Sequence, residues 1–274
     1  GSCRGPAAFA NIYGFRPTPG LIPTVRSSHN KKLPILTTPG CFGRTPEDMS
    51  YFLDAVVGKD NIDPISFNVK GKFYDCELND NEFSKTKICW LSDMDNSYEL
   101  EDGIEDMCNK KLKELEKNNL SIVLPDIKIN TDYLWQSWIC LRSKSIYNDT
   151  LAMNIKNIDD MTEQAIWEYK KGSKIKDDDI DVANKQKLNC FNQVRKLFEK
   201  FDLLALPSAQ IFPFDKKIQY PSEINNKKLD TYHRWLEIFV MSSLLELPTF
   251  SVPIGFNKNG SPMGIQIIGK RGED

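Results

Sequence analysis

Histidine is the rarest titratable residue in this chain of 274 residues, with two copies, and the formal net charge is only −2. A net charge so close to zero gives no electrostatic argument for binding nucleic acid or an anionic membrane. No apolar run approaches the ~20 residues of a membrane-spanning helix, and the first residues do not have the pattern of a signal peptide. We therefore expect neither nucleic acid nor a membrane as a partner.

The scarcity of histidine limits the mechanisms open to the chain, because a serine–histidine–aspartate triad would have to use His29 or His233. His29 lies in a polar stretch, 26–32, and His233 lies on a predicted helix beside Arg234. Nothing near either residue in the sequence would orient it as a base. We interpret both as surface histidines rather than catalytic residues.

The cysteines form no C-x-x-C pair and their number is odd, which disfavours a zinc site and a disulfide framework. Scattered free thiols are typical of a reducing compartment, so we expect a cytoplasmic protein without a metal site. The seven residues are Cys3, Cys41, Cys76, Cys89, Cys108, Cys140 and Cys190.

The composition is that of a globular protein, with 40% hydrophobic and 27% charged residues. A chain of this length can bury a sizeable core. It shows neither internal repeats nor an obvious linker. We predict a single domain over residues 1–274.

The hydrophobic pattern alternates between short apolar runs and amphipathic stretches along most of the chain. Thr45 and Pro46 are typical of a helix start, and Gly58 is typical of its end. A strand, a helix and a strand over 87–124 predict a parallel pair with a right-handed crossover. The predicted strands lie near 87–91, 121–124, 202–206, 250–253 and 263–268, and the predicted helices over 45–58, 104–115, 131–170, 188–201 and from 231 onward.

Two stretches in the second half have more than one interpretation. The aromatic residues of 131–170 are typical of a core, although Trp135 and Trp138 are also candidates for lining a substrate channel. The charged run 171–179 is interpreted as a solvated loop.

The opening stretch, residues 1–20, has the most unusual composition of the chain. Its glycines and prolines predict tight turns with almost no helix or strand period, and its small residues let the backbone approach a ligand closely. A Gly-Ser pair at a chain start is also typical of a protease-cleavage remnant. The register of Ser2 with Arg4, Pro6 and Ala7 favours the interpretation that it is native. Cys3 is interpreted as a buried or bystander thiol.

Several separated motifs resemble the amidase signature family. The opening reads G-S-x-R-x-P-A and then G-x-R-P-T-x-G, which is similar to the serine-nucleophile segment of that family. The run P-G-C-F-G-R-T-P-E-D resembles its second motif, and D-L-L-A-L-P-S-A resembles one of its strands. The ending L-P-T-F-S-V-P-I-G-F … G-S-P-M-G-I-Q-I-I-G is very close to the family pattern. Motifs that recur in the right order from residue 1 to about 269 are more specific than any one of them.

The resemblance implies an α/β fold of the amidase-signature type, with a mixed central sheet flanked by helices and with the N-terminal portion absent from this chain. It implies hydrolysis of a carbon–nitrogen amide bond through a serine acyl-enzyme. On the family pattern, Ser2 is the catalytic nucleophile, Gly1 belongs to the turn that forms the oxyanion hole, and Arg4 organises the loop, with an acid upstream as its expected partner.

The family's remaining catalytic groups, a lysine and a bridging serine in a cis peptide, precede the nucleophile. We therefore assign neither role to a residue of this chain, and we expect the chain alone to be inactive. The resemblance also implies no cofactor and a small-molecule amide as the partner, and a homodimer stays open. Cys41 and Glu246 depart from the pattern, which has proline and glycine there.

Two alternatives remain beside a stand-alone amidase. One is the A subunit of glutamyl-tRNA amidotransferase, which shares the serine segment, and the other is an inactive scaffold that keeps the fold. Tyr232, His233 and Trp235 are more typical of the stand-alone branch. The residues that precede Gly1 would distinguish an enzyme from a scaffold.

Overall fold

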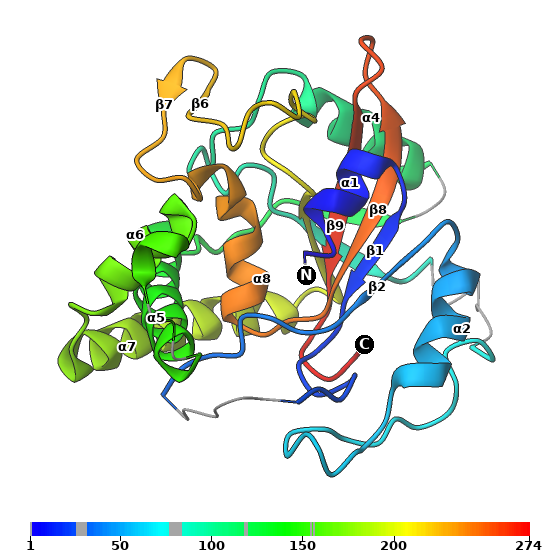
Figure 1. The fold of residues 1–274 in the computed structure, drawn as a ribbon. Helices are drawn as coiled ribbons and strands as arrows, with labels where there is room; N and C mark the ends of the chain where they lie inside the picture. Colours follow the sequence, from blue (N-terminus) through cyan, green and yellow to red (C-terminus); the bar gives the residue numbers. More distant parts are fainter. Residues whose placement is uncertain (1, 26–31, 77–83, 118–119, 154, 156) are drawn as a thin grey trace.

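The computed structural model describes residues 2–25, 32–76, 84–117, 120–153, 155 and 157–274. They form an α/β protein around a mixed sheet of seven strands in the order β2-β1-β8-β9-β5-β3-β4 (Figure 1). This architecture confirms the predicted fold class. The strands are β1 (Tyr13–Arg16), β2 (Cys41–Gly43), β3 (Lys87–Trp90), β4 (Ser121–Val123), β5 (Leu203–Pro207), β8 (Thr249–Phe256) and β9 (Pro262–Ile268).

The five predicted strands are all present in this sheet. β3 pairs in parallel with β4, as predicted, and also with β5, whereas the other pairings are antiparallel. The prediction for the opening stretch was wrong, because it contains both β1 and a short helix, α1 (Gly5–Ala10). β1 has only four residues and pairs with β8, more than 230 residues away, so no local pattern marks it.

The helices differ from the prediction chiefly at their ends. Thr45 caps α2 through its side-chain oxygen, which accepts a hydrogen bond from the Asp48 backbone N–H at 3.1 Å. The predicted helix over 131–170 is two helices, and the predicted loop over 171–179 ends where Asp177 begins the next one. The elements are α2 (Pro46–Val56), α4 (Ile104–Glu116), α5 (Thr131–Ala152), α6 (Glu163–Gly172), α7 (Asp177–Phe198), α8 (Val240–Leu244), the 3₁₀ helices η1 (Ile158–Asp160) and η2 (Arg234–Phe239), and the hairpin β6 (Glu223–Ile224) and β7 (Lys227–Lys228).

The acidic run at the start of α7 has a physical reason to be helical. Three consecutive aspartates, 177–179, occupy the first turn, where negative charge interacts favourably with the positive end of the helix dipole. The Asp179 carboxylate also accepts a hydrogen bond from the Lys176 backbone N–H at 2.9 Å. Charge alone therefore does not distinguish a solvated loop from a helix start.

Two hydrophobic clusters hold the elements together. The larger one lies between the sheet and the helices, and α5, α6 and α7 are grouped on one side of the sheet in Figure 1. The smaller one packs α2, which lies at the other end of the sheet, onto β1 through Met49, Leu53 and Phe15. Trp135 and Trp138 are buried in the larger cluster, so the core interpretation of the aromatic residues is the one that the structure supports. No helix of the described segments is long and apolar enough to cross a bilayer.

His233 corrects a prediction, since it is buried with 1% of its surface exposed rather than lying on the surface. It directly precedes η2 and is surrounded by the rings of Trp138, Trp167 and Tyr232. Its Nε2 lies 2.8 Å from Glu168 Oε1. No local pattern indicates this burial, because both Glu168 and the surrounding tryptophans come from distant helices. His29, the other histidine, lies outside the described residues.

Glu168 is a buried carboxylate with four donors. Besides His233, it accepts hydrogen bonds from Arg142 Nε at 2.7 Å, Ser143 Oγ at 2.6 Å and Tyr232 Oη at 3.1 Å. Burial raises the pKa of Glu168, but the hydrogen bonds from His233 and Ser143 and the charge of Arg142 outweigh it and lower the pKa to about 2. Burial also lowers the pKa of His233, against the opposing effect of Glu168. Arg142 thus supplies the positive charge of this network, and His233 is neutral at pH 7.

Acid should destabilise this packing in two steps. Between about pH 7 and 5 the unfolded chain protonates His233 near pH 6.5, which the folded chain resists, so the contribution of His233 to the free energy of unfolding should fall. Glu237, whose pKa burial raises to about 7, contributes with the opposite sign in this range, because the fold stabilises its protonated form. Below about pH 4.5 the lowered pKa of Glu168 adds a second loss of unfolding free energy, because the fold stabilises the ionised form of Glu168 and acid protonates it.

Thermal unfolding of the full-length protein at pH 7, 6 and 5 tests the first step. His233→Gln keeps a donor for Glu168 and does not titrate, so we expect its Tm relative to that of wild type to rise as the pH falls from 7 to 5. Glu116→Gln, on the exposed face of α4, is the control and should keep the wild-type slope. A His233→Gln slope equal to that of wild type would contradict this assignment.

Candidate active site

Ser2, the predicted nucleophile, lies at the start of the described chain, three residues before α1. Its side chain is exposed, whereas the two residues that follow, Cys3 and Arg4, are buried. Within the described segments the Ser2 hydroxyl makes no hydrogen bond. Gly1 lies outside the described residues, so its role in an oxyanion hole stays a prediction.

The backbone around Cys3 lies in close contact with β1 and with Gly40, the residue before β2. A Cβ atom on Gly14 in β1 would collide with the Cys3 carbonyl oxygen, and one on Gly40 would come within 2.8 Å of the Cys3 sulfur. Only glycine permits such an approach at both positions. Burial raises the pKa of the Cys3 thiol, which keeps it neutral, so Cys3 is a buried thiol, as predicted, rather than the thiolate nucleophile that its place beside Ser2 would allow.

Arg4 fastens the serine loop to η2 and α8. Its Nη1 donates hydrogen bonds to the Phe239 carbonyl oxygen at 3.1 Å and to Ser242 Oγ, and its Nη2 donates to Ser243 Oγ at 2.6 Å. Its guanidinium carbon lies 4.8 Å from the centroid of the Phe239 ring. We call this set of contacts the Arg4 clamp: it joins the residue two places after Ser2 to η2 and α8, more than 230 residues further along the chain.

The Arg4 clamp contains no negative charge. No carboxylate of the described chain pairs with Arg4, and an acidic partner upstream stays a prediction. Burial lowers the pKa of Arg4 to about 9, and the charge of Arg16 contributes to this lowering. Arg4 therefore remains charged at pH 7, held by hydroxyl and carbonyl oxygens instead of an ion pair.

Arg16 places a second buried cation close to the loop. It lies on β1, and its Nη1 donates to the Leu247 carbonyl oxygen at 3.0 Å. Burial lowers the pKa of Arg16 to about 10, partly offset by Glu246. Two buried guanidinium groups beside Cys3 favour negative charge in their surroundings, and fixed charge of this kind stabilises the oxyanion formed during acyl transfer.

Ser242 and Ser243, which complete the Arg4 clamp, were not among the predicted site residues. Both are buried in α8, whose other residues are Val240, Met241 and Leu244. Two adjacent hydroxyls in an otherwise apolar helix need hydrogen-bond partners, so the sequence does indicate that these two serines contact another polar group. The partner itself, 238 residues away from Ser242, could not be identified from this pattern.

Around Ser2 the described residues offer neither a metal site nor an evident lysine base. In the part of the chain that the structure describes, no three histidine, cysteine, aspartate or glutamate side chains are placed to hold a metal ion. Lys187, on α7, is a lysine whose pKa burial lowers, but its Nζ lies 3.9 Å from Glu246 Oε1. All seven cysteines are free thiols.

Comparison with known proteins shows similarity over the whole chain. The A subunit of glutamyl-tRNA(Gln) amidotransferase from Sulfurihydrogenibium sp. (strain YO3AOP1) is 28% identical over 98% of this chain and 58% of its own length. Among solved structures, a bacterial aryl acylamidase of the amidase signature family has a TM-score of 0.81 at 21% identity, over 99% of this chain and 57% of the other. The corresponding A subunit from Thermotoga maritima has a TM-score of 0.72 at 20% identity, over 99% and 57%.

The similarity to solved structures establishes the fold. The chain spans less than two thirds of the length of the relatives that it matches. The family assignment rests on the sequence as a whole, because the model of the family described as Amidase matches residues 1–274. This is the family that the serine segment and the C-terminal motifs resemble. The chain belongs to the Amidase family, whose members include the amidase signature enzymes.

Proposed function

We propose that the protein hydrolyses the carbon–nitrogen bond of an amide, with Ser2 as the nucleophile. The observation that carries this proposal is the Arg4 clamp, which holds the backbone next to an exposed serine in a chain that matches the Amidase family throughout. A fixed backbone beside an exposed hydroxyl suits a nucleophile that must meet its substrate in one orientation. The proposal concerns the whole protein, since the matched relatives are longer than this chain.

The chemistry proposed for Ser2 has two steps. Its Oγ attacks the amide carbonyl carbon while a base takes the hydroxyl proton, and the amine leaves with a proton, so that an ester to Ser2 remains. Water then attacks this ester and releases the acid. The base proposed here is the lysine of the family pattern, acting through a bridging serine, and both are proposed to lie upstream of Gly1. Backbone N–H groups of the turn at Gly1 and Ser2 are proposed to bind the oxyanion.

A second candidate is an amidotransferase component of the type named among the relatives. The identity of 28% to such a component favours it, while the TM-score of 0.81 to an aryl acylamidase favours the stand-alone enzyme. Both would form the same ester on Ser2. They differ in whether turnover of a simple aryl amide needs further protein components, and we propose that it does not.

Ser2→Ala in the full-length protein tests the nucleophile. We expect it to lose both turnover of an aryl amide and covalent labelling by a fluorophosphonate, because the substitution removes the hydroxyl that the Arg4 clamp holds in place. His233→Gln and Ser222→Ala serve as controls and should keep most of the rate. Labelling of Ser2→Ala at the wild-type level would contradict the proposal.

Arg4→Lys tests whether the Arg4 clamp positions Ser2. The substitution keeps the charge but cannot make the forked contacts to Ser242 and Ser243. Misplacement of a reacting group by about 1 Å costs about 100-fold in rate, so we expect kcat to fall by that order while KM changes little. Ser243→Ala, a smaller change, should lower kcat less.

The matched control for Arg4→Lys is Arg271→Lys, at an exposed arginine that pairs with Glu246. It should keep the wild-type kcat. Folded Arg4→Lys and Ser243→Ala proteins, checked by circular dichroism, that both kept the wild-type kcat would show that the clamp serves the fold alone.

We also propose that residues 1–274 by themselves do not turn over amides, because the described residues offer Ser2 no base. The measurement is the release of aniline from an aryl amide by the purified chain. Steady release that Ser2→Ala abolishes would contradict this expectation.

A further inference from the structure

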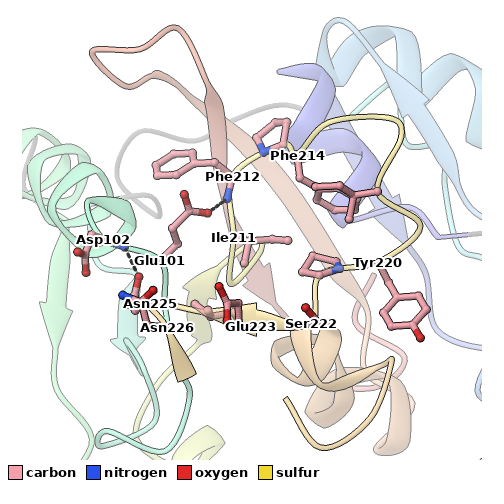
Figure 2. A pocket seen from close by; sticks show the side chains of 14 residues that line it. Glu101, Asp102, Ile211, Phe212, Phe214, Tyr220, Ser222, Glu223, Asn225 and Asn226 are labelled. Carbon is pink, nitrogen blue, oxygen red and sulfur yellow. Dashed lines mark hydrogen bonds between the residues drawn. The ribbon is translucent and has the colours of Figure 1, made fainter. Parts of the chain in front are cut away.

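A cavity of about 660 Å³ lies beside the β6–β7 hairpin, and neither Ser2 nor Arg4 lines it. Figure 2 shows its walls: the segment after β5 that carries Phe212 and Phe214, the hairpin, and residues 101–102 before α4. The volume is within the range of about 300–1,000 Å³ that small-molecule sites occupy. Its size alone therefore allows a drug-sized ligand.

The walls of this cavity combine apolar surface with negative charge. Ile211, Phe212, Phe214, Ile218 and Tyr220 supply apolar and aromatic surface. Among the described residues that line it, the charged ones are all acidic: they are Glu101, Asp102 and Glu223, with no lysine, arginine or histidine.

In the described chain the three carboxylates are not paired with basic side chains, although Lys228 of β7 lies directly opposite Glu223 of β6 in the hairpin. Across the described residues none of them takes part in an ion pair. The nearby Lys227 of the hairpin is already paired with Glu99, at 2.5 Å. Lys216 and Lys217, in the loop between Phe214 and Ile218, are exposed and do not line the cavity.

Hydrogen bonds hold two of the acidic residues in place. Glu101 Oε2 accepts a hydrogen bond from the Phe212 backbone N–H at 2.8 Å, so its carboxylate is fixed against the aromatic wall. The Asp102 backbone N–H donates to Asn225 Oδ1 at 3.3 Å, which ties the turn of the hairpin to the same segment (Figure 2). The hairpin is therefore tied to residues 101–102, and the carboxylate of Glu101 has a fixed position in the wall of the cavity.

The arrangement does not suit a metal ion, since the described residues contain no group of three potential ligands close enough to hold one. Separate carboxylates beside aromatic rings suit a positive charge carried on an apolar body, because the ammonium pairs with a carboxylate while the body covers the rings. We propose that this cavity binds an organic cation of that class, a primary ammonium on an aryl-alkyl body.

This binding site is independent of the chemistry proposed for Ser2. It meets α1 through the edge-to-face packing of Phe214 on Phe9, with ring centroids 6.2 Å apart. Ser2→Ala should therefore bind the amine as wild type does, so that the failure of one proposal leaves the other standing.

Isothermal titration calorimetry of the full-length protein with 2-phenylethylammonium tests the proposal. The matched probes are 2-phenylethanol, which has the same body without the charge, and 3-phenylpropionate, which is an anion. We expect the amine to bind at least about fivefold more tightly than the alcohol, the anion to bind more weakly than either, and the amine affinity to fall when salt is raised from about 50 to about 500 mM. Equal affinities for the three probes would overturn the proposal.

Substitutions locate the binding in the cavity. Glu101→Gln keeps an oxygen that accepts from Phe212, and Glu223 is exposed on the hairpin, so both neutral variants should fold. We expect each of Glu101→Gln and Glu223→Gln to weaken amine binding roughly twofold to fivefold and to leave the alcohol unaffected. Glu116→Gln on α4 is the control and should change nothing. Amine binding that survives the double variant at wild-type affinity would place the site elsewhere and refute the assignment.

Discussion

The buried guanidinium of Arg4 is the interaction on which the serine loop depends. It joins the first residues of the chain to η2 and α8 through three hydrogen bonds and the face of Phe239. Gly14 and Gly40 let the Cys3 backbone and side chain come close to them, but these close contacts only exclude other positions of the loop and do not hold it in place. Without the contacts of the Arg4 clamp, the guanidinium and the hydroxyls of Ser242 and Ser243 would be buried without hydrogen-bond partners. Leaving a buried charge without partners strongly destabilises a fold.

The absence of a carboxylate from the described part of the Arg4 clamp has an electrostatic consequence. An ion pair would neutralise the guanidinium, whereas hydroxyl and carbonyl oxygens leave its charge largely uncompensated. Arg16 adds a second buried charge, which further lowers the pKa of Arg4. The same residues that fix the loop therefore make its surroundings positive, which suits a reaction that passes through an oxyanion.

Much of the fold could be predicted from local pattern, and most of the rest depends on contacts between distant residues. The strands at 87–90 and 203–207 are short apolar runs, and the strand–helix–strand order predicts the parallel pairing of the first with 121–123. The pairing of β5 with β3 and β9 was not predicted. β1, the burial of His233 and the partners of Arg4 could not be predicted, because each depends on residues far away in the sequence. Glu246 is instructive: it replaces the family's glycine with a backbone φ of 59°, a left-handed conformation that glycine adopts freely, and it pairs with Arg271 and Lys187.

The central claim is that the acyl group passes through Ser2. The most direct measurement is acid quenching of the full-length protein during incubation with a slow aryl amide, followed by mass spectrometry of its peptides. We predict that the added acyl mass is found on the Ser2 hydroxyl, and that an isotopic label in the acyl group disappears on a chase with excess unlabelled substrate. Acyl mass on another residue, such as Cys3, or turnover with no covalent adduct at any quench time, would contradict this claim.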